Sequence, residues 1–306
     1  MWWAIILVAV LVTLAWPFWR EARKGVPVRK QAPGAFAATG RGQTHYQWHG
    51  PARGPVVVAI HGLTTPSPVW DGVVPGLLAL GYRVLVYDLY GRGYSDAPRG
   101  RQDRRFFLAQ LNGLLDSQGL RQDLTVMGFS MGGAIATAFA AENPDRLKRL
   151  ILLAPSGIVQ ADDAETRFEV ATPIFGDWLH AVRARARMQA TLAAEPPPGP
   201  GALPRIAALR LAELDRRGYL PAILASRRGM LAELQQAEHR ALAMTDIPVV
   251  AVFGDKDVVV PLRALGTLTA WNRGVQVEVV AGAGHDLPAL HGVEVTAILR
   301  DVLREG

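Results

Sequence analysis

The stretch Leu124–Ala141 reads LTVMGFSMGGAIATAFAA and carries the strongest structural signal in the chain. Its first four residues form a short apolar run typical of a buried strand, and the residues from Met131 onward are typical of a helix. Between them lies a G-x-S-x-G motif, Gly128 to Gly132 around Ser130, in the strand–turn–helix context that exposes a nucleophilic serine on a tight turn. The glycines lack the Cβ atoms that would clash there, and a helix N-terminus favours developing negative charge. The pattern therefore favours Ser130 as a nucleophile over a simple helix N-cap.

Apolar runs alternate with amphipathic segments on both sides of this stretch. The runs that predict strands are Val56–Ile60, Val84–Tyr87, Leu124–Met127, Leu150–Leu153, Val249–Phe253 and Val275–Val280. Helices are expected near residues 71–80, 104–118, 131–142, 262–271 and 288–304. Because the strands are short, nearly continuously apolar and separated by helices, they predict an α/β fold with a mostly parallel, doubly wound sheet.

One interval, residues 157–245, breaks this alternation. It contains helical patterns rich in Ala, Leu and Arg but no good strand. The proline-rich run Glu195–Gly201 (EPPPGPG) cannot be helical and is predicted to be a loop. The simplest account is a helical cap at 157–245, inserted between two parts of one core at 44–156 and 246–306.

An acid and a base follow the serine in the chain order that such an elbow requires. The strand predicted at 249–253 is followed by Asp255 and Asp257, and the next strand is followed by His285. The carboxyl ends of parallel strands meet at one edge of the sheet, where ligands bind in open α/β folds. A carboxylate from one of the two aspartates and the imidazole of His285 are therefore expected close to Ser130.

From about residue 44 to residue 304 the chain resembles the α/β-hydrolase superfamily. The family's G-x-x-D and G-x-G-H segments match Gly254, Asp257, Gly282, Gly284 and His285. The resemblance implies a catalytic triad of Ser130, Asp257 and His285. Asp255 remains the alternative acid, and His291, within the last predicted helix, is the only nearby alternative to His285.

The turn after the first predicted strand supplies the rest of the site. It reads His61-Gly62-Leu63 and resembles the family's H-G turn. The resemblance implies that the backbone N–H groups of Leu63 and Met131 bind an oxyanion, and such donors are worth about 10²–10³-fold in rate each. His61 itself is interpreted as a structural turn residue. Residues 87–96, which resemble the family's D-x-x-G-x-G-x-S segment, are interpreted as scaffold for the mouth of the site.

A serine nucleophile implies acyl transfer: attack on a carbonyl, an acyl-enzyme and hydrolysis by water. The resemblance extends to esterases and monoacylglycerol-lipase-like enzymes, and to carbon–carbon hydrolases that share these motifs. The prediction is a serine hydrolase of a lipophilic or amphiphilic carboxylic ester. A carbon–carbon hydrolase, an amidase, a cofactor-free haloperoxidase and a non-catalytic binding module are the alternatives. The absence of cysteine excludes a thiolate zinc site, and no dinucleotide fingerprint or P-loop occurs, so no metal or cofactor is expected.

The first residues form a candidate membrane segment. Trp2–Trp19 contains one polar residue, Thr13, and as a helix it would rise about 27 Å, close to the hydrocarbon thickness of a bilayer. Tryptophans at both ends match the aromatic belts of membrane proteins. A buried core helix and a secretory signal are the alternatives, but a signal favours basic residues before the apolar run. We therefore expect a retained anchor at residues 1–20.

The charge distribution supports the same organisation. The formal net charge is +6, and five basic residues and one acidic residue between positions 20 and 30 account for four of these charges. Nucleic-acid binding requires a dense basic face, so no nucleic-acid partner is expected. Because these charges follow the apolar run, in a linker at 21–43, the positive-inside rule places the folded part on the cytoplasmic side.

Overall fold

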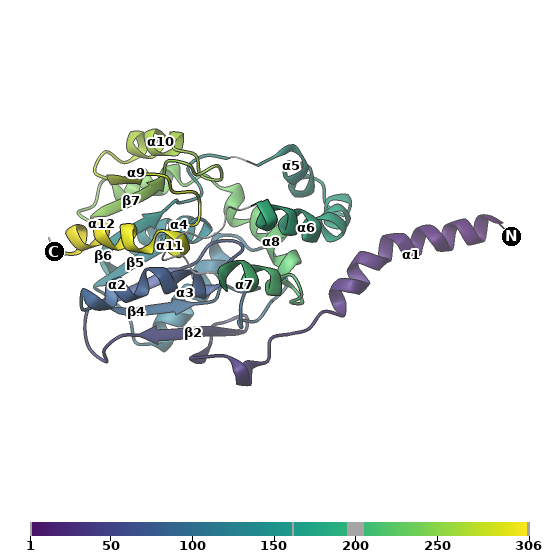
Figure 1. The fold of residues 1–306 in the computed structure, drawn as a ribbon, viewed down its shortest axis with the longest axis horizontal. Helices are drawn as coiled ribbons and strands as arrows, with labels where there is room; N and C mark the ends of the chain where they lie inside the picture. The colour runs from purple at the N-terminus through teal and green to yellow at the C-terminus, as the bar shows by residue number, and fades with distance from the viewer. Residues whose placement is uncertain (1, 161, 195–204, 305–306) are drawn as a thin grey trace.

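A computed structural model describes residues 2–160, 162–194 and 205–304. Its centre is an eight-stranded sheet in the order β1-β2-β4-β3-β5-β6-β7-β8 (Figure 1). The strands are β1 (Ala35–Ala38), β2 (Gln43–His49), β3 (Val56–Ile60), β4 (Arg83–Tyr87), β5 (Leu124–Phe129), β6 (Leu147–Leu153), β7 (Val249–Gly254) and β8 (Gln276–Val280). β1 and β2 are antiparallel to their neighbours, whereas β3 to β8 pair in parallel. The predicted α/β fold with a mostly parallel sheet is confirmed.

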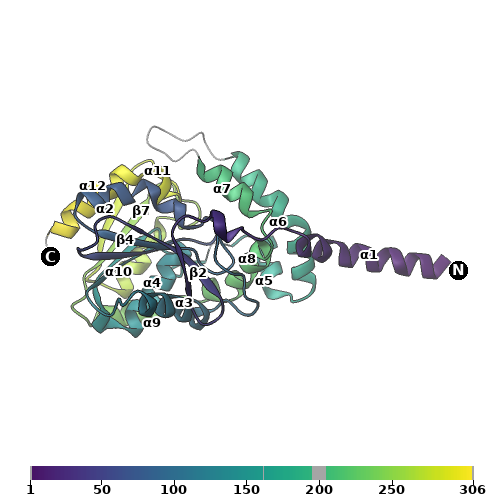
Figure 2. The same ribbon diagram turned by 90° about the horizontal axis from the view of Figure 1, so that it is seen from below.

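Two layers of helices cover the sheet (Figure 2). Seven α-helices belong to these layers: α2 (Val74–Ala79), α3 (Arg104–Ser117), α4 (Met131–Glu142), α9 (Gln236–Leu242), α10 (Arg263–Trp271), α11 (Leu287–Leu290) and α12 (Gly292–Arg304). Figure 2 shows α2, α11 and α12 on one face, with α3, α4, α9 and α10 on the other. All of β5 and nearly all of α4 are buried, because this strand and this helix lie at the middle of the sheet. The central elements therefore fix the position of the turn between them.

The structure differs from the sequence-based elements in three places. Residues 35–38 and 43–49 form strands β1 and β2, although the linker was expected to extend over residues 21–43. The helix expected at 71–80 is a 3-10 helix at Ser67–Gly72 followed by α2. The helix expected at 288–304 is broken into α11 and α12, so that His291 lies at the break rather than within a helix. The remaining 3-10 helices are Arg29–Gln31, Pro144–Arg146 and Met230–Ala232.

The described residues between β6 and β7 form helices joined by loops, and none of them forms a strand of the sheet. This interval contains α5 (Ala164–Ala171), α6 (Phe175–Ala194), α7 (Arg205–Glu213) and α8 (Tyr219–Arg228) before α9. In both views these four helices gather at one end of the sheet, on the side from which the N-terminal helix leaves (Figures 1 and 2). The loop predicted at Glu195–Gly201 lies outside the described residues. The division into anchor, linker, core and cap stays a proposal.

The N-terminal helix α1 (Trp2–Ala22) is long, apolar and mostly exposed. Its best 18-residue window has a mean hydropathy of 2.0, and only 6% of that window is buried. By length and composition it could cross a membrane, and a signal sequence would pass the same test. Its last turn and the residues that follow it contact the rest of the protein: Glu21 Oε1 accepts from the Gly218 N–H at 2.7 Å, and Gly25 O accepts from the Arg217 N–H at 2.8 Å.

Candidate active site

Ser130 occupies the turn between β5 and α4 in a conformation that non-glycine residues rarely adopt. Its backbone angles are φ 53° and ψ −119°, a type of strain that costs about 1–3 kcal/mol and concentrates at functional sites. A Cβ on Gly128 would lie 2.2 Å from Gly132 O, and one on Gly132 would lie 2.0 Å from Ile60 O. Only glycine fits at both positions. Although Ser130 precedes α4, its hydroxyl makes no capping hydrogen bond to the helix.

The serine, the histidine and one aspartate lie in a row. Ser130 Oγ is 2.9 Å from His285 Nε2, and His285 Nδ1 is 2.8 Å from Asp257 Oδ2. The other carboxylate oxygen of Asp257 accepts hydrogen bonds from the backbone N–H groups of Val259 and Val260, both at 2.8 Å. The Asp257 side chain is fully buried. These bonds leave Asp257 Oδ2 directed at the imidazole.

The alternative residues occupy different positions. Asp255 is exposed, and its Oδ1 accepts from the Gly282 N–H at 2.7 Å, so it fastens the loop before His285 instead of contacting the ring. His291 Nδ1 lies 3.7 Å from Glu294 Oε1. A Cβ on Gly254 would lie 2.3 Å from Ala283 O, which shows how closely the loops after β7 and β8 approach each other. The structure therefore brings Asp257, not Asp255, to His285.

The turn after β3 passes beside Ser130. A Cβ on Gly62 would lie 3.2 Å from Ser130 Cβ. The backbone N–H groups of Leu63 and Met131 have no acceptor among the described residues, and Met131 is the first residue of α4, where an N–H has no partner within the helix. An oxyanion site requires N–H donors that have no other acceptor and that lie close to the nucleophile. The N–H groups of Leu63 and Met131 are candidates for such donors.

His61 has a different role from His285. Its Nε2 accepts from the Leu89 N–H at 2.8 Å, and its Nδ1 lies 2.7 Å from Gly62 O. Burial lowers the pKa of His61 to about 4, so the ring is neutral at physiological pH. Both nitrogens are engaged in holding loops, as expected for a structural turn residue.

Three side-chain contacts to the loop after β3, two of them from α7 and α8, could not be anticipated from motifs. Arg92 Nε donates to Leu63 O at 3.0 Å, Tyr219 Oη to Thr64 O at 2.8 Å, and Arg210 Nε to Thr65 Oγ1 at 2.6 Å. Arg210 also forms an ion pair with Asp286, the residue after His285. Arg92 further bonds Ser226 on α8 at 2.8 Å. The loop beside Ser130 is thus bonded directly to the segment 157–245 at Thr64 and Thr65, and at Leu63 through Arg92.

A buried ion pair lies behind the same loops. His45 Nδ1 is 2.8 Å from Asp88 Oδ2, and His45 Nε2 contacts Pro33 O. Asp88 also accepts from the backbone N–H groups of Ser67 and Tyr94, both at 2.9 Å. Burial by itself raises the pKa of Asp88, but the bond to His45 outweighs it and the pKa falls to about 2. Burial by itself lowers the pKa of His45, and Asp88 reverses this so that the pKa rises.

This pair predicts a pH-dependent contribution to stability. Asp88, with a lowered pKa, stabilises the fold above its unfolded value of 3.8, and the effect is lost as the pH falls toward 2. His45, with a raised pKa, stabilises the fold below 6.5, and the effect is lost as the pH rises through its folded pKa. The free-energy difference between the wild type and His45→Gln should therefore be largest between about pH 4 and 6.5.

Urea unfolding of both proteins from about pH 3 to pH 9 measures this difference. His61 and His239 are buried with pKa values lowered to about 4, so they weaken the fold as the pH falls. Because both proteins contain them, their effect cancels in the comparison. A difference that stays constant with pH would contradict an ionised pair.

Within residues 2–160, 162–194 and 205–304, no group of three His, Cys, Asp or Glu side chains is arranged to hold a metal ion.

A second hydroxyl, Ser156 Oγ, lies 3.3 Å from Ser130 Oγ. The ring of Phe129 lies 5.1 Å from the ring of His285 and covers one side of it. The Ser130 hydroxyl therefore has an imidazole and a second hydroxyl within hydrogen-bond distance.

Comparison with known proteins shows the family of this chain. A 2-hydroxymuconate semialdehyde hydrolase from Pseudomonas sp. CF600 is 27% identical over 269 residues, which cover 84% of this chain and 89% of that protein. A pimeloyl-[acyl-carrier protein] methyl ester esterase from Neisseria meningitidis is 29% identical over 256 residues, covering 82% and 93%. The crystal structure of a membrane phospholipase A, described as a bacterial virulence factor, matches with a TM-score of 0.71 and 20% identity over 99% of this chain and 96% of that one. The family model for the alpha/beta hydrolase fold matches residues 55–291. The chain belongs to the alpha/beta hydrolase family.

Proposed function

We propose that this protein is a membrane-anchored serine hydrolase that cleaves a carboxylic ester with a lipophilic or amphiphilic acyl group. One observation carries the proposal: Ser130 Oγ, in a strained turn, lies 2.9 Å from His285 Nε2, and Asp257 lies 2.8 Å from the far side of the same ring. A nucleophile, a base within hydrogen-bond reach and a group that orients the base make up the arrangement of a covalent acyl-transfer site.

In this mechanism Ser130 Oγ attacks the ester carbonyl while its proton passes to His285 Nε2. Asp257 accepts from His285 Nδ1–H, which fixes the tautomer and stabilises the imidazolium. The N–H groups of Leu63 and Met131 receive the charge on the carbonyl oxygen. Collapse of the tetrahedral intermediate expels the alcohol, which takes the proton from His285. Water, deprotonated by the same ring, then hydrolyses the acyl-enzyme.

The remaining parts of the chain have roles in the same proposal. Residues 2–19 anchor the protein in a membrane, 21–43 join the anchor to the core and 157–245 form a helical cap over the site. Four of the six net charges lie within residues 20–30, which favours the cytoplasmic side for the catalytic part. A carbon–carbon hydrolase is the second candidate, because a relative 27% identical over 84% of the chain is named for such a reaction.

A substrate panel on the purified full-length chain tests the ester assignment. We expect p-nitrophenyl esters to be hydrolysed with kcat/KM rising from short to medium acyl chains, because each added methylene buried in an apolar pocket contributes about 0.8 kcal/mol. Vinylogous 1,5-diketones, the substrates of carbon–carbon hydrolases, should turn over at least about 10²-fold more slowly. The reverse preference would assign the triad to carbon–carbon cleavage. No turnover of either class and no labelling by a fluorophosphonate would contradict catalysis.

A further inference from the structure

The turn between α5 and α6 exposes large apolar side chains to solvent. Ile174 is 77% exposed and Phe175 is 70% exposed. Phe175, Trp178 and Val182 follow an i, i+3, i+7 spacing along α6, so they share one face of that helix. Phe168 on α5 is 47% exposed as well. An apolar stripe of this kind is characteristic of an interaction surface.

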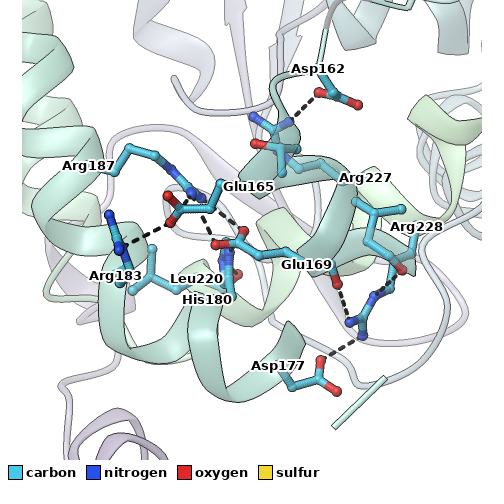
Figure 3. Close-up of polar contacts among 12 residues, drawn as sticks. Asp162, Glu165, Glu169, Asp177, His180, Arg183, Arg187, Leu220, Arg227 and Arg228 are labelled. Atoms are coloured by element: carbon cyan, nitrogen blue, oxygen red, sulfur yellow. Dashed lines mark hydrogen bonds and ion pairs between the residues drawn. The ribbon is translucent and has the colours of Figure 1, made fainter. Parts of the chain in front are cut away.

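The 172–178 turn is firmly held. Arg228 donates from Nη2 to Glu169 O at 2.6 Å and from Nε to Val170 O at 3.1 Å, and its Nη1 bonds Asp177 at 2.6 Å (Figure 3). Asp177 in turn accepts from the Ile174 N–H at 2.9 Å. Ile174 has a φ of 69°, a conformation that disfavours β-branched residues. The fold therefore keeps a β-branched residue at a positive φ, which is sterically unfavourable, and exposes its apolar side chain to solvent.

A polar network joins α5 to α6, the two helices that the turn connects. Glu169, whose side chain is fully buried, accepts from Arg187 at 2.9 and 3.0 Å, and its Oε2 lies 2.8 Å from His180 Nδ1 (Figure 3). Burial by itself raises the pKa of Glu169, but the bonds to His180 and Arg187 outweigh it and the pKa falls to about 2. The ionised Glu169 carboxylate thus links α5 to α6 through hydrogen bonds and holds the two helices on either side of the exposed turn in place.

The apolar stripe lies beside α1. Trp178 Nε1 donates to Thr13 O at 3.4 Å, and α1 packs against α6. In Figures 1 and 2, α1 leaves the molecule at the end where α5 and α6 lie. Thr13 is six residues before Trp19, which corresponds to about 9 Å along the helix axis. If Trp19 lies at headgroup depth, Trp178 lies within the outer hydrocarbon of the same leaflet.

A cavity of about 680 Å³ separates the last turns of α1 from α8. Pro17, Phe18 and Leu224 contribute apolar walls, and Arg20 and Lys24 contribute charge at the end that faces the linker. Ser130 and His285 do not line it.

From these observations we propose that the 172–178 turn and the adjoining face of α6 insert into the bilayer beside α1, in the leaflet next to the folded part of the protein. The occupant of this surface is the lipid bilayer itself, because the surface continues that of a helix whose apolar side chains have no protein partner along most of its length. The proposal rests on the membrane anchoring proposed above. It adds that the cap, and not the anchor alone, contacts lipid and fixes the orientation of the active site toward the membrane.

Depth-dependent fluorescence quenching of the full-length chain in phospholipid vesicles tests the proposal. The sequence contains no cysteine, so a single introduced cysteine gives an unambiguous site for an environment-sensitive probe. Phe175→Cys reports on the turn, Leu11→Cys on the middle of α1, and Val293→Cys is the matched control. Val293 is 75% exposed and belongs to α12, a helix that lies away from α1 in Figure 1.

We expect lipids brominated near the headgroup to quench the probe at 175, lipids brominated in mid-chain to quench the probe at 11, and neither to quench the probe at 293. Quenching at 11 without quenching at 175 would overturn the insertion of the turn while leaving the anchor intact. The absence of quenching at both sites would overturn the anchor and the insertion together. Equal quenching at 293 would mean that the contact with lipid is not specific to this face.

A substitution separates membrane contact from a structural role. Asparagine tolerates positive φ better than isoleucine, so Ile174→Asn should keep or raise the Tm. Removing the apolar contact should lower hydrolysis of an ester embedded in vesicles by about tenfold, while a water-soluble ester is cleaved at an unchanged rate. Val293→Asn is the control and should change neither rate. An equal loss on both substrates with Ile174→Asn would assign the residue a structural role and contradict membrane contact.

Discussion

Ser130→Ala is expected to reduce kcat by about 10⁶-fold and to abolish labelling by a fluorophosphonate, because the hydroxyl that lies 2.9 Å from His285 Nε2 is lost. The measurement is steady-state hydrolysis of a p-nitrophenyl ester, together with covalent labelling of the folded protein. KM should change little, since the hydroxyl contributes to bond formation rather than to binding. The variant also removes only one oxygen from a buried turn, so the fold should be retained.

Ser156→Ala provides the matched control for this variant. Its hydroxyl lies only 3.3 Å from Ser130 Oγ, but His285 Nε2 is directed at Ser130. We expect this variant to keep labelling and to lose no more than about tenfold in kcat. Labelling that survives Ser130→Ala and disappears in Ser156→Ala would transfer the nucleophilic role to the second serine.

The second large effect is expected for Asp257→Asn, which should reduce kcat by about 10⁴-fold. An amide at this position can donate to the ring, so it favours the tautomer in which His285 Nε2 carries the proton and cannot accept one from Ser130. The Val259 and Val260 N–H groups still find an acceptor in the amide oxygen, so the loop should remain in place. Activity should recover partly at high pH, where hydroxide can deprotonate the serine without the ring.

Asp255→Asn is the paired control, two residues away in the same loop. The side chain of Asp255 bonds the Gly282 N–H, and an amide oxygen can replace that contact. We expect its kcat/KM to stay within about threefold of the wild type. If Asp255→Asn lost far more activity than Asp257→Asn, the acid would have been assigned to the wrong residue.

The sequence was most informative where local geometry restricts residue choice. The turn at Ser130 demands glycine on both sides, so its position could be predicted from five residues. The choice between Asp255 and Asp257 is harder, since both follow β7 and both carry a carboxylate. Only the direction in which each side chain leaves the loop distinguishes them, and the N–H groups of Val259 and Val260 determine that direction for Asp257.

The missed features depend on contacts between distant segments. β1 reads AFAA, a sequence with little strand propensity, and it forms because β2 offers an unpaired edge. The bonds of Arg92, Arg210 and Tyr219 to the loop after β3 join residues 29 to 155 positions apart. Arg210 and Tyr219 lie on α7 and α8. Because arginine-rich helices are usually solvated on one face, the sequences of these helices give no sign that particular side chains reach the site.

The direct pairing of β6 with β7 has a consequence for the evolution of this protein. Leu150 to Leu153 align with Val249 to Val252 as adjacent parallel strands, although residues 154–248 separate them along the chain. Closing a loop of that size depends only weakly on its length: halving it changes the entropic term by about 0.6 kcal/mol. The excursion between the two strands can therefore be shortened, lengthened or exchanged with little effect on sheet assembly. Selection can replace helices α5 to α8 as a unit while Ser130, Asp257 and His285 stay in place.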